Sequence, residues 1–423
     1  MLMRIVTNEE MRHLEEKSIA DGISVESLMQ NAGLAVALHI KEITGTLSNI
    51  PVLVLIGPGN NGGDGLIAAD HLNEWGAEVT AYIALPRKKS DTVTDPQISG
   101  SLTIIEAEND PDLHKFRLAL SKSLIVIDAI LGTGVSRPIT GILKKLLVAL
   151  EQEHCSRSDL NIIAVDVPTG VNPDTGGCDP IALTADSTIA LGYPKVATFA
   201  FPGAERFGKL RIADIGMYTS TTEETKTHLI TQGSIRHVLP KRPLNSHKGT
   251  FGRVLVVAGS SKYIGAACLA CEAAARTGAG IVTLAIPESL HTIVASKLTE
   301  TTYLILPEKN GQLLPSAADL ILKEIEYYDS FLIGCGIGQE PGMVQLVKRI
   351  LLESGELKIP SVLDADCINI ISSMPEWWSL INDQSILTPH VGEMSRLTGK
   401  TTDEIGASRM DITKNSALEW QKS

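Results

Sequence analysis

The hydrophobic positions in the first half of the chain follow two alternating patterns. Short apolar runs that end at a turn predict buried parallel strands, and segments with apolar residues three or four apart predict helices. The strands are predicted at Val52–Ile56, Val79–Ile83, Thr103–Ile105, Leu124–Asp128, Ile162–Asp166, Ser187–Ala190 and Leu210–Ile212, and the helices at Val25–Ile43, Asp64–Trp75, Pro111–Leu120 and Thr140–Glu153. Thr7 with Glu10 predicts a capping box that opens a further helix. This alternation predicts a doubly wound α/β domain with an open, mostly parallel, Rossmann-like sheet.

The pattern stops after about residue 218 and resumes near residue 247. The segment YTSTTEETKT is polar, and LPKRPLNS has neither helical nor strand periodicity. We therefore expect a first domain at 1–218, a linker at 219–246 and a second doubly wound α/β domain at 247–423. Its strands are predicted at Val254–Ala258, Ile281–Ala285, Tyr303–Leu306, Ser330–Ile333, Ser361–Asp364 and Ile386–Leu387, and its helices at Gly265–Gly278, Glu288–Leu298, Ser316–Tyr327 and Gly342–Ser354.

Charge and composition narrow the classes of partner. A net charge of −12 without a basic stripe argues against nucleic acid, and the short basic run Pro86–Lys89 is interpreted as a solvated loop. No secretory signal and no apolar run of membrane-spanning length are found, so we expect a soluble, cytoplasmic protein. The six scattered cysteines are predicted to be reduced and mostly buried. The helical N-terminus could form the face of a homo-oligomer.

Candidate chemistry lies where the predicted strands of the first domain end. Asp64 follows the glycine loop GPGNNGGDG, Asp128 precedes GTGVSRPITG, and Asp166 precedes VPTGVN. Each acid alone could cap a helix or bind loop amides. The carboxyl ends of neighbouring parallel strands share one edge, so together the three acids predict a ligand crevice. No Lys follows the glycines, which argues against a P-loop for a transferring phosphate. Asn61, Asp128 and the Thr169 region offer only oxygen, which suits an alkali or alkaline-earth ion.

These motifs resemble a known family. GPGNNGGDG, DAILGTGVSRPITG, AVDVPTGVN and LGYPK are similar, in this order, to the N-terminal domain of NAD(P)H-hydrate epimerases. HKGTFGRVLVVAGS, AARTGAGIVTLA, GCGIG, DADCIN and TPHVGEMSR resemble the ribokinase-related, ADP-dependent NAD(P)H-hydrate dehydratases. The resemblance implies a bifunctional enzyme that repairs NADH and NADPH hydrated at C6 of the nicotinamide ring.

The resemblance also implies site residues. In the first domain the hydrate would be bound by Asn60, Asn61, Gly62, Gly63, Asp64, Gly132, Thr133, Gly134, Val135, Ser136, Arg137, Pro138 and Asp166, and a potassium ion by Asn61, Asp128 and Thr169. Asp166 is the expected proton shuttle at the C6 hydroxyl, with Lys195 as either its catalytic partner or a solvated surface lysine. In the second domain the hydrate would be bound by Ala266, Gly336, Gly338, His390, Val391, Gly392, Glu393, Met394, Ser395 and Arg396, with ADP and magnesium as co-substrate and ion.

The second domain departs from the family pattern. No GSGD motif, which would supply the anion hole and catalytic Asp, follows TPHVGEMSR. We therefore expect an incomplete sheet lacking about 70 to 80 residues of a usual domain, whether as a fragment or as a natural variant. The tail 401–423 should then lack strands to pack against, and ADP-dependent dehydration should be absent. Two alternatives stay open: a sugar or pyridoxine-type kinase, and a non-catalytic nucleotide-binding module.

Overall fold

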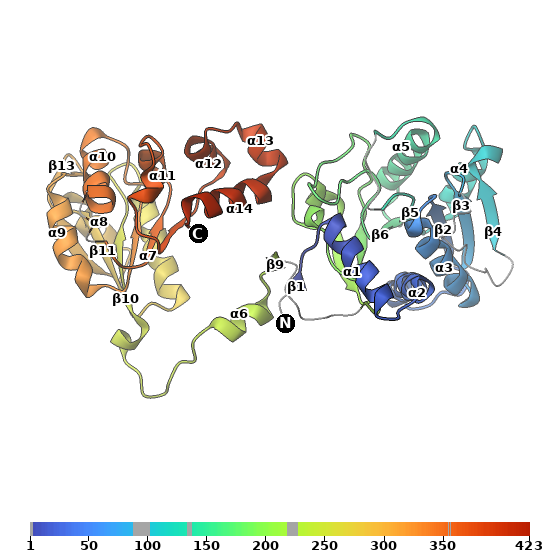
Figure 1. The fold of residues 1–423 in the computed structure, drawn as a ribbon, viewed down its shortest axis with the longest axis horizontal. Helices are drawn as coiled ribbons and strands as arrows, with labels where there is room; N and C mark the ends of the chain where they lie inside the picture. Colours follow the sequence, from blue (N-terminus) through green and yellow to red (C-terminus); the bar gives the residue numbers. More distant parts are fainter. Residues whose placement is uncertain (1–2, 88–101, 133–137, 218–226, 354, 356) are drawn as a thin grey trace. The chain divides into compact units, whose positions relative to one another are not determined.

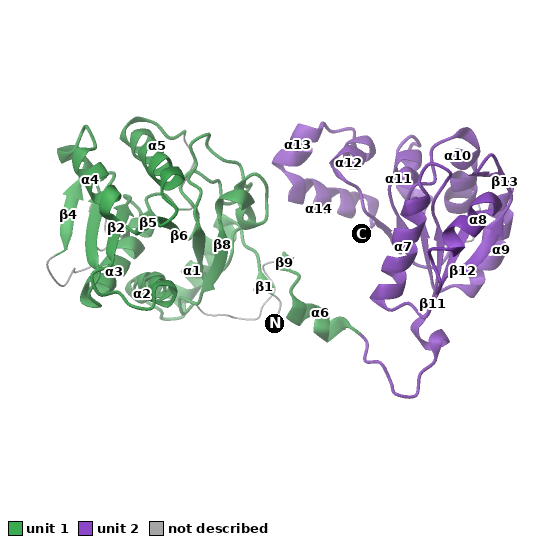
Figure 2. Ribbon diagram, turned by 180° about the vertical axis from the view of Figure 1, so that it is seen from behind, with its two compact units in different colours: residues 1–239 green, residues 240–423 purple. Residues whose placement is uncertain are grey.

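The computed structural model describes residues 3–87, 102–132, 138–217, 227–353, 355 and 357–423. The chain divides into two compact units, unit 1 at Met1–Leu239 and unit 2 at Pro240–Ser423 (Figure 2). The segment expected to be a linker, 219–246, contains two elements of unit 1: strand β9 (His228–Leu229) and helix α6 (Gln232–Val238). β9 pairs antiparallel with β1 (Met3–Arg4), so these residues join the N-terminus to the end of unit 1.

The sheet of unit 1 has seven parallel strands in the order β4-β3-β2-β5-β6-β7-β8 (Figure 1). Each predicted strand is present, shifted by a residue or two at its ends. Their bounds are β2 Pro51–Ile56, β3 Glu78–Ile83, β4 Thr103–Glu106, β5 Ile125–Ala129, β6 Asn161–Val165, β7 Ser187–Leu191 and β8 Lys209–Ala213. The prediction of a doubly wound α/β domain is confirmed.

Two apolar cores cover the two faces of this sheet. Along β2, alternate side chains enter different cores, as the two-residue period of a strand requires. Val52 and Val54 pack with helices α1 (Asn8–Ala20), α2 (Val25–Thr44) and α3 (Asn60–Glu74). Leu53 and Leu55 pack with α4 (His114–Lys122) and α5 (Gly141–Ser156). The predicted capping box is present, because Thr7 caps α1 and Glu10 bonds back to Thr7.

Helix α3 begins one turn earlier than its predicted start at Asp64. The turn after β2 is limited to Gly57–Gly59, and Asn60–Gly63 form the first turn of the helix. Glycine disfavours helices, which is why the sequence predicted a longer loop. The first-turn N–H groups of a helix have no acceptor within it. A helix N-terminus, rather than a free loop, therefore lies at the carboxyl edge of the sheet.

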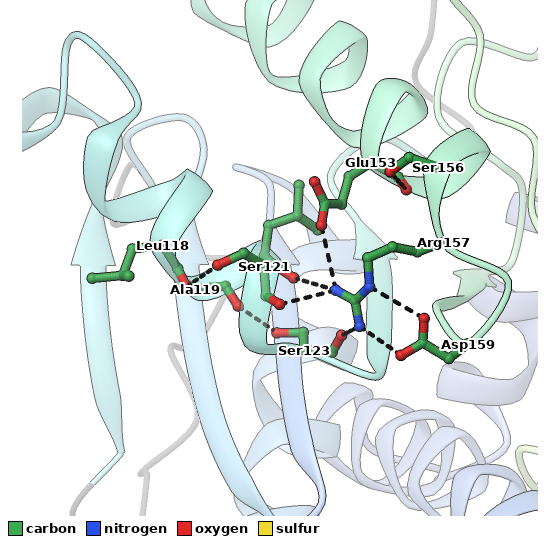
Figure 3. Close-up of polar contacts among 9 residues, drawn as sticks. Leu118, Ala119, Ser121, Ser123, Glu153, Ser156, Arg157 and Asp159 are labelled. Atoms are coloured by element: carbon green, nitrogen blue, oxygen red, sulfur yellow. Dashed lines mark hydrogen bonds and ion pairs between the residues drawn. The ribbon is translucent and has the colours of Figure 1, made fainter.

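Arg157, directly after α5, joins this helix to the end of α4 (Figure 3). Its guanidinium donates to the carbonyl oxygens of Leu120, Ser121 and Ser123, at and just after the end of α4. It also pairs with Glu153 and with Asp159, at 3.4 Å and 2.8 Å. Because all these acceptors are protein groups, Arg157 has a structural role.

Unit 2 holds a six-stranded parallel sheet in the order β12-β11-β10-β15-β16-β17, which confirms the second α/β domain. Its strands are β10 Arg253–Val257, β11 Ile281–Pro287, β12 Thr302–Leu306, β15 Ser330–Ile333, β16 Ser361–Leu363 and β17 Ser385–Leu387. A small hairpin is formed by β13 Glu308–Lys309 and β14 Gln312–Leu313. Its helices are α7 Ile264–Thr277, α8 Glu288–Ala295, α9 Ala317–Glu324, α10 Pro341–Lys348, α11 Asp366–Ile371, α12 Val391–Thr398, α13 Thr402–Ala407 and α14 Arg409–Trp420.

The tail 401–423 packs within unit 2, so the expectation that it lacks packing partners is wrong. The Trp420 ring at the end of α14 lies 5.0 Å from that of Trp377 and 6.3 Å from that of Trp378, between ring centroids. The backbone of Ser423 accepts from the Leu387 N–H at 2.8 Å, on the edge strand β17. Aromatic packing and edge pairing, neither visible as a motif, account for the difference.

Two further predictions concern thiols and membranes. All six cysteines are free, but only Cys271 and Cys367 are buried, and Cys155 is exposed, so the prediction of mostly buried thiols is wrong. Within the described ranges, no helix has the length and apolar character needed to cross a bilayer.

Candidate active site

The crevice predicted for unit 1 corresponds to the carboxyl edge of the sheet where the strand order reverses, between β2 and β5. Ligands of open α/β sheets bind at the carboxyl edge of such a switch point. The two loops that leave these strands touch directly: a Cβ on Gly57 would lie 1.6 Å from the carbonyl oxygen of Ile130. Only glycine allows this approach, so the glycine at the start of the loop serves the contact between strand ends.

Asp128, at the end of β5, is fully buried and held by Thr169. The Thr169 backbone N–H donates to Oδ2 and its hydroxyl to Oδ1, both at 2.7 Å. Burial raises the pKa of Asp128 to about 6, against the lowering effect of the Thr169 hydrogen bonds. Among the described residues no ion pair is formed by Asp128, and buried carboxylates are usually paired or bound to a cation.

Asn61, in the first turn of α3, lies against the second loop. A Cβ on Gly132 would come within 3.4 Å of the Asn61 amide oxygen. The Asn61 Nδ2 is buried and has no hydrogen-bond partner among the described residues. A flip of the Asn61 amide would exchange its two terminal atoms and place the oxygen where Nδ2 now lies. Leu131, next to Gly132, donates its N–H to the Thr169 hydroxyl at 3.0 Å. Asn61 thus lies against the loop that Thr169 holds, and Thr169 bonds to Asp128. The oxygens of these three residues are of the kind that suits an alkali ion.

Asp166 and Lys195 form a buried ion pair at the ends of β6 and β7. The Lys195 Nζ donates to Asp166 Oδ1 and, at 3.2 Å, to the Leu191 carbonyl oxygen. The Leu191 N–H donates to the same carboxylate at 3.0 Å. Lys195 is 1% exposed, so the alternative of a solvated surface lysine is wrong. Asp166 has a left-handed backbone (φ 65°), a sparsely populated conformation that clusters at functional sites.

Asp64, on the first turns of α3, belongs to the same group of charges. Burial raises its pKa well above the ordinary value, and the negative charges of Asp166 and Glu15 raise it further. Lys195 and Arg87 oppose that shift. The pKa of Glu15, half-buried on α1, is also raised by burial. This edge of the sheet therefore combines a carboxyl group whose pKa is raised by burial with a carboxylate that is paired with a lysine.

The remaining residues predicted to bind the hydrate in unit 1 lie in the glycine loop and in the loop after β5. Thr133, Gly134, Val135, Ser136 and Arg137 lie outside the described residues. Asn60 and Pro138 are exposed, and Gly62 and Gly63 are buried in the first turn of α3.

Two charged residues of the crevice were missed in the sequence. Glu15 lies on the inward side of α1 between buried Leu14 and Ser18, and a charge at such a position was the available signal. Arg87 was assigned to a solvated loop, which is wrong. Its Nη1 donates to the Gly57 and Gly59 carbonyl oxygens at 2.8 Å and 3.1 Å. Lys88 and Lys89 lie outside the described residues.

Unit 2 has a corresponding edge at the switch point between β10 and β15. A Cβ on Gly336 would lie 3.0 Å from the Ala266 Cβ in the first turn of α7, so these two predicted residues meet. The Gly338 N–H donates to Asp366 Oδ2 at 2.9 Å. The Thr388 hydroxyl donates to Asp364 Oδ1 at 2.8 Å, next to the start of α12. The loops after β15, β16 and β17 are thereby connected.

Helix α12 carries the segment His390–Arg396. His390 caps the helix, accepting the Gly392 N–H at 3.0 Å, and Glu393 returns a bond to the His390 N–H at 2.9 Å. Arg396 donates to the Asn369 side chain of α11 at 2.8 Å. Val391 packs against the apolar core and Met394 lies within it, while the Ser395 hydroxyl donates to the Lys400 carbonyl oxygen. The side chains of His390 and Arg396 are exposed.

The fold and these groups define a two-unit α/β protein with a cluster of buried charged side chains at the carboxyl ends of the strands of unit 1, and with a second such strand edge in unit 2. The family described as YjeF-related protein N-terminus matches residues 25–197, and the NAD(P)H-hydrate dehydratase family matches residues 254–422. A bifunctional NAD(P)H-hydrate repair enzyme of Moorella thermoacetica is 36% identical over 99% of this chain and 79% of its own length. That of Thermofilum pendens is 32% identical over 97% and 77%. The chain belongs to the family of bifunctional NAD(P)H-hydrate repair enzymes.

Among solved structures, the ADP/ATP-dependent NAD(P)H-hydrate dehydratase of Bacillus subtilis, co-crystallised with ATP and Mg²⁺, is 31% identical. The match covers 45% of this chain and 63% of that one, with a TM-score of 0.37. The family matches in both halves favour a repair enzyme over the kinase and over the non-catalytic module.

Proposed function

We propose that unit 1 interconverts the two C6 epimers of hydrated NADH and NADPH. The observation that carries this proposal is the buried Asp166–Lys195 pair, which faces a second, raised-pKa acid, Asp64, at the switch point. Acid and base catalysis needs two groups whose environments separate their pKa values. Family membership supplies the substrate class.

The substrate's pyrophosphate is assigned to the first turn of α3. Gly59, the N-cap residue, has no side chain that could cap the helix. The N–H groups of Asn60, Asn61 and Gly62 have no acceptor within the helix, whereas that of Gly63 donates to the Gly59 carbonyl oxygen at 3.3 Å. A helix N-terminus favours an anion through these donors and the helix dipole. The nicotinamide end of the hydrate then reaches toward Asp64 and Asp166.

Epimerisation breaks and re-forms a bond at C6. Asp64 donates its proton to the C6 hydroxyl, the C6–O bond breaks with its electrons on oxygen, and water leaves as N1 forms a double bond to C6. Water then adds to the other face of C6 and gives its proton to Asp166. Proton exchange between the two acids restores the starting state. Lys195 compensates the charge of Asp166 and holds its orientation.

A potassium ion fits the oxygen set of Asn61, Asp128 and Thr169. When bound, it supplies a positive charge that offsets the buried Asp128 carboxylate. The residues themselves connect α3 to the loops after β5 and β6, and so hold the walls of the crevice together.

For unit 2 we assign binding of the same hydrate at the edge formed by Ala266, Gly336, Gly338 and α12, with ADP and magnesium as in dehydratases. The family match over residues 254–422 favours dehydration, against the expectation drawn from the absent GSGD motif. Incubation with the S epimer and ADP decides between them. Recovery of NADH absorbance supports dehydration, and an unchanged absorbance supports the sequence-based expectation.

The test of the epimerase is direct. Purified protein is mixed with hydrate enriched in one epimer, and the epimer ratio is followed by chromatography without ADP. We expect the ratio to relax to equilibrium with wild-type protein and to remain fixed with Asp166→Asn. A folded wild-type protein that binds the hydrate without changing the ratio would support the non-catalytic alternative.

A further inference from the structure

Arg87 reaches the glycine loop from the segment after β3, the strand beside β2. It donates one guanidinium nitrogen to two carbonyl oxygens, those of Gly57 at 2.8 Å and Gly59 at 3.1 Å. These carbonyls flank the turn that ends β2 and starts α3. One side chain therefore fixes both sides of the turn.

The glycine at position 62 makes room for this contact. A Cβ there would lie 2.5 Å from the same Arg87 nitrogen and 2.1 Å from the Gly57 carbonyl oxygen. On Gly63 a Cβ would lie 3.7 Å from the other terminal nitrogen of Arg87. Gly62 thus accommodates Arg87, whereas the tight neighbour of Gly63 is the Met29 sulfur, 2.8 Å from a Cβ at that position.

We propose that Arg87 is a positioning residue that fixes the glycine loop, so that the first turn of α3 presents its N–H groups to the pyrophosphate of the substrate. This inference rests on the proposed function, because it assigns the substrate's phosphates to that turn. The loop sequence itself, from Gly57 to Gly65, carries no cationic residue. Arg87 supplies both the geometry and a positive charge.

The charge of Arg87 also acts on Asp64. Arg87 lowers the pKa of Asp64, although burial dominates the shift. The guanidinium therefore lies near the acid on the next turn of α3. Arginine suits this position because its planar group holds several acceptors in a fixed geometry, whereas lysine is a flexible point charge.

The experiment compares Arg87→Gln and Arg87→Lys with wild-type enzyme in the epimerase assay, with inorganic pyrophosphate as a competitor. For Arg87→Gln we expect KM and the inhibition constant of pyrophosphate to rise about tenfold or more, the usual scale of a hydrogen bond to a charged group. The value of kcat should stay within about threefold. The KM and the pyrophosphate inhibition constant of Arg87→Lys should lie between those of wild type and those of Arg87→Gln. Arg211→Gln, which removes an exposed arginine paired with Glu42, is the matched control and should change neither constant.

Gly62→Ala gives a second route. An added methyl group clashes with the Gly57 carbonyl oxygen and with the Arg87 nitrogen that donates to it, so it breaks the same contact as Arg87→Gln. Gly62→Ala should therefore raise KM, and the double variant with Arg87→Gln should be less than additive. Fully additive effects, or an Arg87→Gln variant with unchanged KM and pyrophosphate inhibition, overturn the inference. Pyrophosphate binding is also measured by calorimetry, independently of turnover. A wild-type protein that does not epimerise, but whose pyrophosphate affinity falls in Arg87→Gln, would overturn the proposed function alone. If Arg87→Gln does not fold, Arg87→Lys and Gly62→Ala carry the same test.

Discussion

The Lys195 ammonium and the Asp166 carboxylate are buried against each other, and both bond the backbone of Leu191. The pair therefore ties the end of β6 to the end of β7 through one residue of β7. Removing one partner of a buried ion pair leaves an uncompensated charge, at a cost of about 3 to 5 kcal/mol. The pair is consequently both a structural joint and the charged wall of the crevice.

Asp166→Asn should lower stability, because Lys195 is left without its partner, and the folded protein should lose turnover while it retains substrate binding. The amide keeps the size of the side chain and an acceptor for the Leu191 N–H, but it cannot take a proton from water at C6. We expect kcat to fall by about a hundredfold or more, the usual contribution of a positioned general base. Steady-state kinetics and direct binding of the hydrate measure the two effects separately.

Asp186→Asn is a suitable control for that variant. Asp186 accepts from His154 and from the Ile162 N–H, away from the crevice, so its loss should lower stability slightly and leave kcat unchanged. Equal losses of kcat in both variants would show that a general destabilisation, rather than proton transfer, causes the effect.

Asp128→Asn should alter the pH dependence of stability. The folded pKa of Asp128, about 6, exceeds its ordinary value of 3.8. The unfolded chain therefore releases this proton first, and wild-type stability falls as pH rises from about 4 through about 6. The loss approaches about 3 kcal/mol for this group. Asp128→Asn has no titrating carboxyl at this position, so its stability does not show this fall with pH. Without potassium, it should gain stability relative to wild type between pH 4.5 and pH 7.5, measured by urea unfolding.

Potassium provides the second half of this test. It should stabilise wild type at pH 7.5, but not the Asn variant, and a bulky organic cation should not replace it. The variant should also bind the hydrate more weakly. A stability difference that is constant with pH, or activity indifferent to the replacement of potassium, would contradict the assignment of the ion site.

The strands and their acids could be predicted because they follow local patterns. Buried parallel strands are continuous apolar runs, and a carboxylate directly after such a run lies at the carboxyl edge of the sheet. Asp128 and Asp166 were located in this way. The start of α3 was not, because helix propensity disfavours the glycines after Asn61, whereas the fold uses them for close contacts.

Contacts between distant segments could not be predicted from the same patterns. Arg87 lies 30 positions after Gly57, and its neighbours in sequence suggested a solvated loop. The backbone of Lys195 pairs with that of Val6, so the burial of Lys195 depends on a segment far away in the sequence. The tail of unit 2 was misjudged for the same reason, because Trp420 packs with Trp377, far away in the sequence.

Unit 1 should function alone when it ends at Leu239, and less well when it ends at Met217. The Ile5 N–H donates to the Thr227 carbonyl oxygen, and β9 pairs with β1, beside the segment that holds Lys195. The shorter chain loses these bonds, each worth about 1 kcal/mol. We expect full epimerase activity for 1–239 and a lower melting temperature for 1–217. A folded but inert 1–239 would show that the site needs residues of unit 2.

Glu15→Gln should shift the alkaline limb of the pH–rate profile to lower pH. In the proposed reaction Asp64 must be protonated, so activity falls as pH rises through its pKa. The negative charge of Glu15 raises that pKa, although burial contributes more. Removing the charge lowers the pKa of Asp64, so the limb moves to lower pH while the rate at low pH stays the same. Asp64→Asn, which holds no transferable proton, should lose the rate at every pH.

Glu16→Gln separates this effect from a change in the overall charge of α1. Glu16 lies on the exposed side of the helix, one residue away, and its replacement removes the same charge. The alkaline limb of the pH–rate profile should move much less in Glu16→Gln than in Glu15→Gln. The rate is measured from pH 5 to pH 10 at saturating hydrate, so that the profile reports the enzyme–substrate complex. Equal shifts in the two glutamine variants, or an alkaline limb that persists in Asp64→Asn, would remove Asp64 from the role of proton donor and leave Asp166 as the only acid–base group of the crevice.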